Sequence, residues 1–422
     1  MSRHSNPLSH TLTIQISIAL ILGTIAGLLI KNLPIDPVIQ SFIIENILQI
    51  GGSLFIDLMK MLVIPVVFVS LVYGCSSLGN VGKLGSIGLK TFVLYIFTTI
   101  LALVFALSIA SLLNIGTGIH IEVPHQFNPG AAPPIRDVIR DLVPSNPLKA
   151  MAAGNMLQVI VFSLFLGSAI LISGTYGKKV RDIFFNFNEV LMRLVTIVMK
   201  FSPYGIFCLL ASVFAKQGFD VLKELLQYFL IVLLVLVVQL SLTYPFLLKF
   251  IARLNPITFF RKMFSAMLFA FSVSSSNASI PIVLETLEDK LGVDNSVASF
   301  IVPLGATINM DGTAIMQGVA TVFIANAYHI DIGLSGYITV VLMATLASIG
   351  TAGVPSVGLI TLGMVLQQVG LPLEGIALII GVDRLLDMAR TAVNVTGDAV
   401  VACVVAKNEK LLDQQIYNSK NL

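Results

Sequence analysis

The chain has 422 residues, of which 56% are hydrophobic and only 11% are charged, and its mean hydropathy is +0.94. Soluble proteins carry about 25% charged residues, so this composition predicts an all-α membrane protein embedded in a lipid bilayer. The formal net charge of +3, without a basic tract, argues against nucleic acid as a partner. The first apolar run lacks a small-residue cleavage site, so we expect no cleavable signal peptide.

Six apolar runs come first in the chain and predict membrane-spanning helices, at about 11–30, 44–75, 90–115, 155–173, 189–215 and 225–251. The prolines of residues 116–147 indicate an exposed extracellular loop. Lysine and arginine are enriched in the segments that are cytoplasmic if the N-terminus is inside. This bias predicts eight full crossings of the cell (inner) membrane, with both termini in the cytoplasm.

The pattern changes after residue 258, where polar, small-residue segments interrupt the apolar sequence at 271–281, 304–314 and 346–356. Paired interruptions in corresponding positions indicate inverted repeats around a transporter site. We therefore expect two re-entrant helical hairpins, at 258–292 and 336–372. Their tips would be two comparable pentapeptides, Asn277–Pro281 and Thr351–Pro355. The alternative is two ordinary pairs of kinked helices.

Charged and amide side chains recur with helical spacing near the C-terminus. Asp383, Asp387, Arg390, Asn394 and Asp398 follow one another at intervals of 4, 3, 4 and 4 residues, which places them on one face of a helix. Charges at membrane depth usually face a bundle interior and mark a substrate or ion path. Arg390 suits a carboxylate, Asp387 an ammonium group, and Asp383 could hold Arg390 in place. Alternatively, these three charges neutralise one another without a ligand.

A second acidic residue interrupts the seventh predicted span. Asp311 follows Asn309 in the string NMDGT, and hard cations prefer carboxylate, amide and carbonyl oxygens. An unwound turn from Gly305 to Asn309 would supply free carbonyls. This pattern predicts a cation site, and a salt bridge between Asp311 and an arginine is the alternative.

The serine run Ser274–Ser276 lies at the expected tip of the first hairpin. Hydroxyls and free amide groups at the start of a half-helix favour a carboxylate, whereas packing is the alternative role. No histidine or lysine is suitably placed to activate these serines, so we do not expect an enzyme.

Four strings, SSSNASIP, GATINMDGT, ASIGTAGVP and DMARTAVNVTGD, resemble the glutamate transporter family, also called dicarboxylate/amino acid:cation symporters. They occur in the family's order over roughly 258–407. The resemblance implies a homotrimer in which a transport part moves like an elevator against a scaffold. It assigns residues 1–75 to the scaffold helices 1 and 2, and residues 76–115 to helix 3 of the transport part. Residues 116–254 would contain the extracellular loop, the scaffold helices 4 and 5 and the transport helix 6. Residues 255–407 would form the transport core, and residues 408–422 a cytoplasmic tail.

The resemblance also implies the site residues. The substrate pocket would comprise Ser274, Ser275, Ser276, Thr313, Val354, Asp387, Arg390, Thr391 and Asn394. One Na⁺ would be held by Gly305, Asn309, Asn394 and Asp398, and a second by Thr307, Ser348, Ile349 and Thr351. A third would be held by Tyr95, Thr98, Thr99, Asn309 and Asp311.

Some positions depart from the family. Ser274 stands where archaeal members have an arginine, and Met388 where animal members have one. We expect that Arg384, in the string GVDR, does not replace these arginines on the same helical face. The resemblance implies L-aspartate or L-glutamate as substrate and Na⁺ as coupling ion, because Asp398 stands where proton-coupled members tend to have Asn. Proton coupling and a C4-dicarboxylate substrate are the alternatives.

Overall fold

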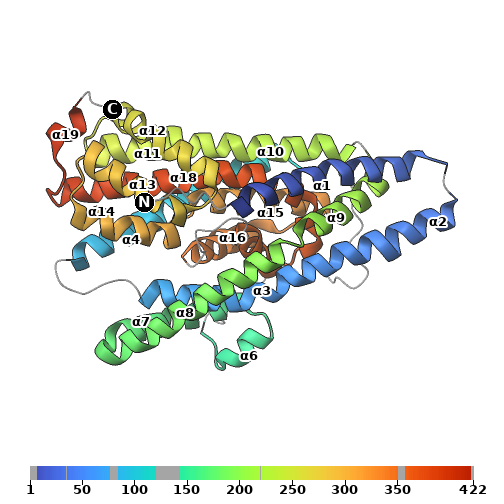
Figure 1. The fold of residues 1–422 in the computed structure, drawn as a ribbon, viewed down its shortest axis with the longest axis horizontal. Coiled ribbons are helices and arrows are strands. Elements are labelled where there is room, and N and C mark those ends of the chain that lie inside the picture. The colour runs from blue at the N-terminus through green and yellow to red at the C-terminus, as the bar shows by residue number, and fades with distance from the viewer. Residues whose placement is uncertain are drawn as a thin grey trace.

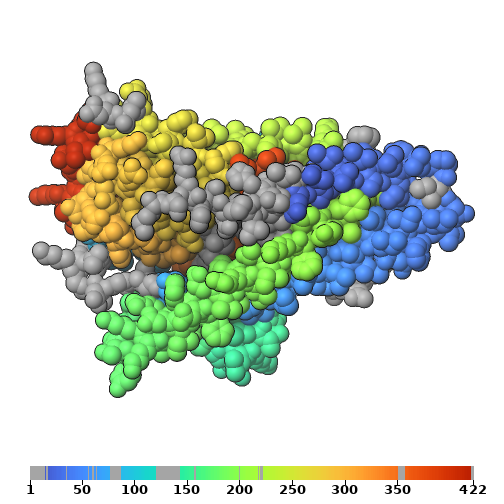
Figure 2. All heavy atoms as spheres, in the orientation of Figure 1, coloured from blue at the N-terminus to red at the C-terminus, as the bar shows by residue number. Residues whose placement is uncertain are grey.

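The computed structural model of the chain describes residues 7–34, 36–76, 84–119, 143–218, 220–349 and 357–419. Within these ranges every extended regular element is a helix, which confirms the predicted all-helical class. The β-type pairing in the same ranges is limited to one bridge between Val293 and Leu412. The molecule is elongated, with the earliest helices at one end and the C-terminal helices at the other (Figure 2).

The helices at the N-terminal end form one group (Figure 1). It contains α1 (Pro7–Asn32), α2 (Pro37–Phe42), the π-helical turn η1 (Ile43–Leu48), α3 (Gln49–Ser76) and α9 (Ser202–Gln217). α1 and α9 lie against each other along their length. Gly23 and Gly27 permit this approach, because a Cβ atom there would lie 2.8 Å from the Phe207 carbonyl oxygen and 2.5 Å from that of Ala211.

The helices from the middle of the chain pack on two different groups of helices. These are α4 (Leu84–Leu112), α6 (Pro147–Ala152), α7 (Met156–Ile172), α8 (Gly174–Met199) and α10 (Asp220–Val238), with α10 continued by η2 (Gln239–Thr243), α11 (Tyr244–Phe246) and η3 (Leu247–Ile251). α7 and α8 pack on α3, whereas α4 and α10 pack on the later helices. Leu226, Leu230 and Leu234 are exposed on one face of α10, as expected for a surface in contact with lipid.

The last part of the chain is built from shorter, interrupted helices and one long helix. These are α12 (Pro256–Val273), α13 (Ser276–Glu285), η4 (Thr286–Lys290), α14 (Asn295–Ile308), α15 (Asp311–Ala327), α16 (Gly333–Ser348), α17 (Val357–Gln368), η5 (Leu373–Gly375), α18 (Ile376–Asn408) and α19 (Gln414–Asn418). α15 and α18 lie in the centre and contact each other. Almost every residue of α15 is buried, so its apolar side chains can face in all directions.

Two helix pairs occupy the ranges predicted to be hairpins. α12 and α13 contact each other and are separated by Ser274 and Ser275. The turn therefore precedes Asn277–Pro281, which lies inside α13, and the predicted position of this tip was wrong by a few residues. α16 and α17 also contact each other. The second pentapeptide, Thr351–Pro355, lies outside the described residues.

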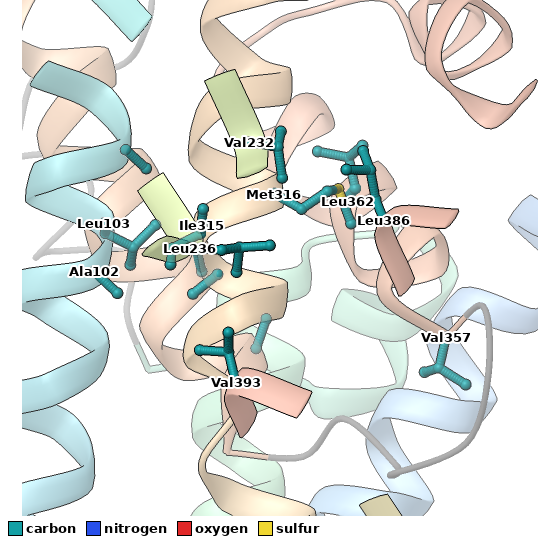
Figure 3. Close-up of a cluster of buried hydrophobic side chains, with 14 of the residues drawn as sticks. Ala102, Leu103, Val232, Leu236, Ile315, Met316, Val357, Leu362, Leu386 and Val393 are labelled. Atoms are coloured by element: carbon teal, nitrogen blue, oxygen red, sulfur yellow. The ribbon is translucent and has the colours of Figure 1, made fainter. Parts of the chain in front are cut away.

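Side chains from α15 and four other helices form an apolar cluster (Figure 3). α4, α10, α15, α17 and α18 contribute Ala102, Leu103, Val232, Leu236, Ile315, Met316, Val357, Leu362, Leu386 and Val393, all buried. This packing holds the polar residues of α15 and α18 in the interior. Interiors are close-packed, so these polar side chains have little freedom to move.

Among the described residues, four helices are long and apolar enough to cross a membrane: Pro37–Phe55, Ile87–Leu112, Leu222–Ile251 and Pro256–Val273. Gly174–Val198 and Ser202–Lys216, bent by 49°, could form a fifth span. These apolar helices support a multi-pass membrane protein, but the predicted count of eight crossings is not confirmed. The difference has a physical reason: α14 and α15 are separated by a break, and α18 carries several charges.

Candidate functional site

The acidic and basic residues of α18 share one buried face. α18 is one continuous helix from Ile376 to Asn408, so the predicted spacing places Asp383, Asp387 and Arg390 together. Arg390 Nη1 lies 3.0 Å from Asp383 Oδ1, and Arg390 Nη2 donates a 2.8 Å hydrogen bond to Asp387 Oδ1. The prediction that Asp383 holds Arg390 is therefore consistent with the geometry.

The Arg390 guanidinium still has unused hydrogen-bonding capacity. Its Nε and Nη1 atoms are buried and form no hydrogen bond with the described residues, although Nη1 is within ion-pair distance of Asp383. Buried donors normally have an acceptor, and leaving one unmatched costs about 1–3 kcal/mol. A ligand carboxylate, which accepts charge-assisted hydrogen bonds from a guanidinium, is the group that would use these donors.

The first turn of α17 lies beside Arg390 and Thr313. A Cβ atom on Gly358 would lie 3.1 Å from Thr313 Cγ2 and 3.5 Å from Arg390 Nη1. The glycine therefore leaves space next to the guanidinium that a larger residue would fill. Val354, predicted to contribute its backbone here, lies outside the described residues.

The first hairpin presents its serines at a helix start. Ser274 has the left-handed φ of 53°, and the Ser275 hydroxyl oxygen accepts a 3.3 Å hydrogen bond from the Ala278 amide. Ser276 begins α13, and all three serines are buried. The Ser274 hydroxyl has no hydrogen-bond partner among the described residues. Both arms of this hairpin contact α18.

Two further predicted substrate residues make contacts within the bundle. The Thr391 hydroxyl donates to the Asp387 carbonyl oxygen at 2.7 Å, in its own helix. Asn394 Oδ1 accepts a 2.8 Å hydrogen bond from the Gly312 amide, which joins α18 to the first turn of α15.

A break between α14 and α15 lies at the centre of the predicted cation region. α14 continues to Ile308, and only Asn309 and Met310 leave the helical conformation. The expected unwinding from Gly305 was therefore wrong, because Gly305 still accepts a hydrogen bond from the Asn309 amide at 2.8 Å. A helix end leaves its last carbonyls without donors from the same helix, so this break still offers backbone oxygens.

Asp311 is buried at the start of α15 and is surrounded by neutral donors. Its Oδ1 accepts from the hydroxyls of Thr98 at 3.2 Å and Thr99 at 2.8 Å. Its Oδ2 accepts from Gln239 Nε2 and the Tyr244 hydroxyl, both at 2.9 Å. Within the described part of the chain Asp311 pairs with no arginine, so the salt bridge that the sequence left open is not seen there.

Asp398 lies close to the same break. Asn309 Nδ2 donates to Asp398 Oδ1 at 2.9 Å, and Thr98 Oγ1 is 3.5 Å from Asn309 Oδ1. A Cβ atom on Gly305 would collide with Asp398 Oδ1 and would lie 2.5 Å from the Tyr95 hydroxyl. The structure thus brings most residues of the first and third predicted cation sets into one buried cluster.

The residues of the second predicted cation set are placed less completely. The Ser348 hydroxyl donates to the Ile308 carbonyl oxygen at 2.9 Å and accepts from the Met310 amide at 3.1 Å, so the end of α16 contacts the helix break. Ile349 follows it and is buried. The Thr307 hydroxyl donates to the Leu304 carbonyl oxygen at 2.9 Å, within α14. Thr351 lies outside the described residues.

The sequence pattern of the sodium:dicarboxylate symporter family matches residues 12–408. The chain belongs to this family. It is 33% identical to the proton/sodium-glutamate symport protein of Bacillus subtilis (strain 168), over 95% of this chain and 94% of the relative. It is also 33% identical to the proton/glutamate-aspartate symporter of Escherichia coli (strain K12), over 95% and 93%. An excitatory amino acid transporter of Caenorhabditis elegans is 32% identical, over 92% and 85%.

Family membership confirms the resemblance found in the motifs. The family and these relatives are transporters, which confirms the expectation that the chain is not an enzyme.

The structure of this family member places three further residues at the site. Arg384 Nη1 is 3.7 Å from Asp387 Oδ2, so its guanidinium lies beside a carboxylate that Arg390 also contacts, and the expectation that Arg384 does not replace the missing arginines stays a prediction. Residues three positions apart are neighbours on a helix surface, so the long Arg384 side chain can reach the Asp387 carboxylate. Gln239 and Tyr244 contact Asp311. The sequence could have indicated them, because they are among the few polar side chains in an apolar run.

Proposed function

We propose that the chain transports L-aspartate or L-glutamate across a membrane. The observation that carries this proposal is the buried Arg390 guanidinium, whose Nε and Nη1 donors form no hydrogen bond with the described residues. A side-chain carboxylate of the substrate would accept them. The names of the bacterial relatives, which transport glutamate or aspartate, support the same substrate class.

Asp387 supports an amino acid over a plain dicarboxylate. Its carboxylate is next to Arg390, and it would receive the substrate ammonium group. Succinate would instead bring a second carboxylate towards Asp387 without a cation, and like charges at short range repel. Ser274–Ser276, Thr313, Thr391 and Asn394 would complete the pocket.

Uptake into proteoliposomes tests the substrate. Labelled aspartate and glutamate should accumulate, whereas succinate and serine should not, and preferred uptake of succinate would overturn this proposal. Counterflow in the same vesicles provides a test of the transport class. A carrier exchanges internal unlabelled substrate for external label, whereas a channel only equilibrates the two sides.

We propose Na⁺ as the coupling ion. Asp311 and Asp398 are buried, and neither forms an ion pair with lysine or arginine in the described ranges. A buried carboxylate without a cation is strongly unfavourable, and oxygen ligands suit Na⁺. Hydroxyl, amide and carboxylate oxygens surround the break at Asn309, as a hard cation would require.

The competing hypothesis is proton coupling, since the printed names of the bacterial relatives include protons. The experiment that separates the two imposes a Na⁺ gradient at clamped pH, and then a proton gradient without Na⁺. The Na⁺ gradient alone should drive accumulation. Accumulation driven by protons without Na⁺ would reject the ion and leave the substrate assignment intact.

We also propose a homotrimer with an elevator mechanism in the cell (inner) membrane, with both termini in the cytoplasm. Two groups of helices support a division into scaffold and transport parts. α1, α3, α7, α8 and α9 pack mainly on one another, whereas α4, α12, α14, α15 and α18 form the group that holds the site. Cross-linking in native membranes tests the trimer, and a monomer there would contradict it.

A further inference from the structure

The C-terminal segment, residues 409–419, folds back onto the base of the first hairpin. We define this base as the beginning of α12 together with residues 286–294, at the end of the hairpin away from Ser274. The Asp413 amide donates to the Gly292 carbonyl oxygen at 2.8 Å, and the Asp294 amide donates to the Leu411 carbonyl oxygen at 2.9 Å. α19 therefore lies beside α12 at one end of the molecule (Figure 1).

Lys262 joins the two arms of the hairpin to this segment. The residue is on α12 and is almost fully buried. Its ammonium group donates to the carbonyl oxygens of Lys290 at 2.9 Å, Ile416 at 2.7 Å and Tyr417 at 3.0 Å. The Ser419 hydroxyl oxygen also lies within hydrogen-bond distance of this nitrogen, at 3.1 Å, so three N–H donors are shared among four oxygens. One side chain thus connects α12, the end of η4 and α19.

The acceptors explain why a lysine is buried at this point. Lys290 is the last residue of η4, and Ile416 and Tyr417 belong to the last turn of α19. The final carbonyls of a helix have no donors from the same helix and carry partial negative charge, which favours a cation. The Ile416 carbonyl oxygen also accepts from the Ser419 amide at 3.1 Å. At these two helix ends Lys262 supplies donors to the carbonyls of Lys290 and Tyr417 as well, so it compensates polar groups that would otherwise oppose burial of this region.

The fit around the C-terminal segment is close. Tyr417 is fully buried, and its hydroxyl donates to the Asn255 carbonyl oxygen at 2.9 Å. Gly292 has a φ of +69°, and a Cβ atom there would lie 2.6 Å from the Asp413 carbonyl oxygen. The segment is therefore fixed at both ends of α19 and does not merely lie on the surface.

We propose that the C-terminal segment is a working part of the carrier, in which Lys262 is a positioning residue that fixes the hairpin base and so orients the serine tip. The orientation of the tip towards substrate rests on the proposed function above. The fixing of the base does not depend on it. The two parts of the proposal therefore need separate measurements.

The test uses the full-length carrier with Lys262→Met, which keeps a long side chain and removes the donors. Arg261→Met is the matched control, because Arg261 is the preceding residue of α12, carries the same charge and is exposed. Amide hydrogen exchange in peptides covering 286–294 and 411–419 should become at least about tenfold faster in Lys262→Met. It should be unchanged in the control, while exchange in α15 stays slow in both variants.

Tyr417→Phe provides a milder second variant, because it removes one hydrogen bond and keeps the buried ring. Exchange at the base should rise by a few fold. Wild-type exchange at 286–294 in both Lys262→Met and Tyr417→Phe would overturn the proposal, as would equal acceleration in Arg261→Met. If Lys262→Met does not fold, Tyr417→Phe decides.

Substrate affinity tests the positioning role. Binding of aspartate in the presence of Na⁺ should weaken about three- to tenfold in Lys262→Met and stay unchanged in Arg261→Met. Faster exchange with unchanged affinity would overturn positioning and leave a purely structural contact. If the wild-type carrier binds neither aspartate nor glutamate, the proposed function fails, and the exchange data still decide whether the segment fixes the base.

Discussion

Replacing Arg390 by alanine should remove high-affinity binding of acidic amino acids. Two guanidinium nitrogens, Nε and Nη1, form no hydrogen bond with the described residues, so the substrate carboxylate would gain two charge-assisted hydrogen bonds. Each is worth about 1.5–3 kcal/mol, and the loss of about 3–6 kcal/mol corresponds to a roughly 10²- to 10⁴-fold weaker dissociation constant. Small neutral amino acids lack the second carboxylate, so the substitution should not weaken their binding. The variant should bind them at least as well as the wild type does.

The measurement is calorimetric titration of aspartate and serine into purified protein in the presence of Na⁺. Arg390→Ala also leaves Asp383 and Asp387 without their shared cation, which costs stability. Thermal unfolding must therefore show that the variant is folded. Arg384→Ala is the comparison variant, since it removes the other cation beside Asp387 and keeps Arg390 in place. Tight aspartate binding by a folded Arg390→Ala protein would refute the assignment.

Three other substitutions test separate parts of the site. Asp398→Asn replaces a buried carboxylate that accepts a hydrogen bond from Asn309. The variant should need an at least about tenfold higher Na⁺ concentration for uptake, because the full negative charge is lost. Unaltered Na⁺ dependence would contradict this. Asp311→Asn places an amide among four donors. It should lower the free energy of unfolding by about 2–4 kcal/mol, and it should also lower the affinity for Na⁺. A variant with wild-type thermal unfolding and a wild-type Na⁺ titration would show that the carboxylate is not needed. Gly358→Ala adds a methyl group 3.5 Å from Arg390 Nη1. It should weaken the binding of glutamate, the longer substrate, a few fold more than the binding of aspartate, which competition assays would measure. If the variant binds both amino acids as tightly as the wild type does, this space has no role in binding.

The class of the protein and the local order of its site could be predicted from the amino-acid sequence. Apolar composition predicts helices in a membrane, and helical spacing alone places Asp383, Asp387 and Arg390 on one face. Both results depend on near neighbours in the chain. The resemblance to the family then predicted Thr98, Thr99 and Asp311 as one set, which local periodicity could not have linked.

The contacts between distant segments could not be predicted from the sequence and became visible in the folded chain. Gln239 and Tyr244 reach Asp311 because α10 and its continuation pack against α15, and Lys262 reaches α19 because the chain folds back after α18. The helix break lies at Asn309 because α14 keeps its backbone hydrogen bonds up to that residue. These contacts share one cause. Burial requires every polar group to find a partner, and close packing across the whole molecule selects which partner is within reach.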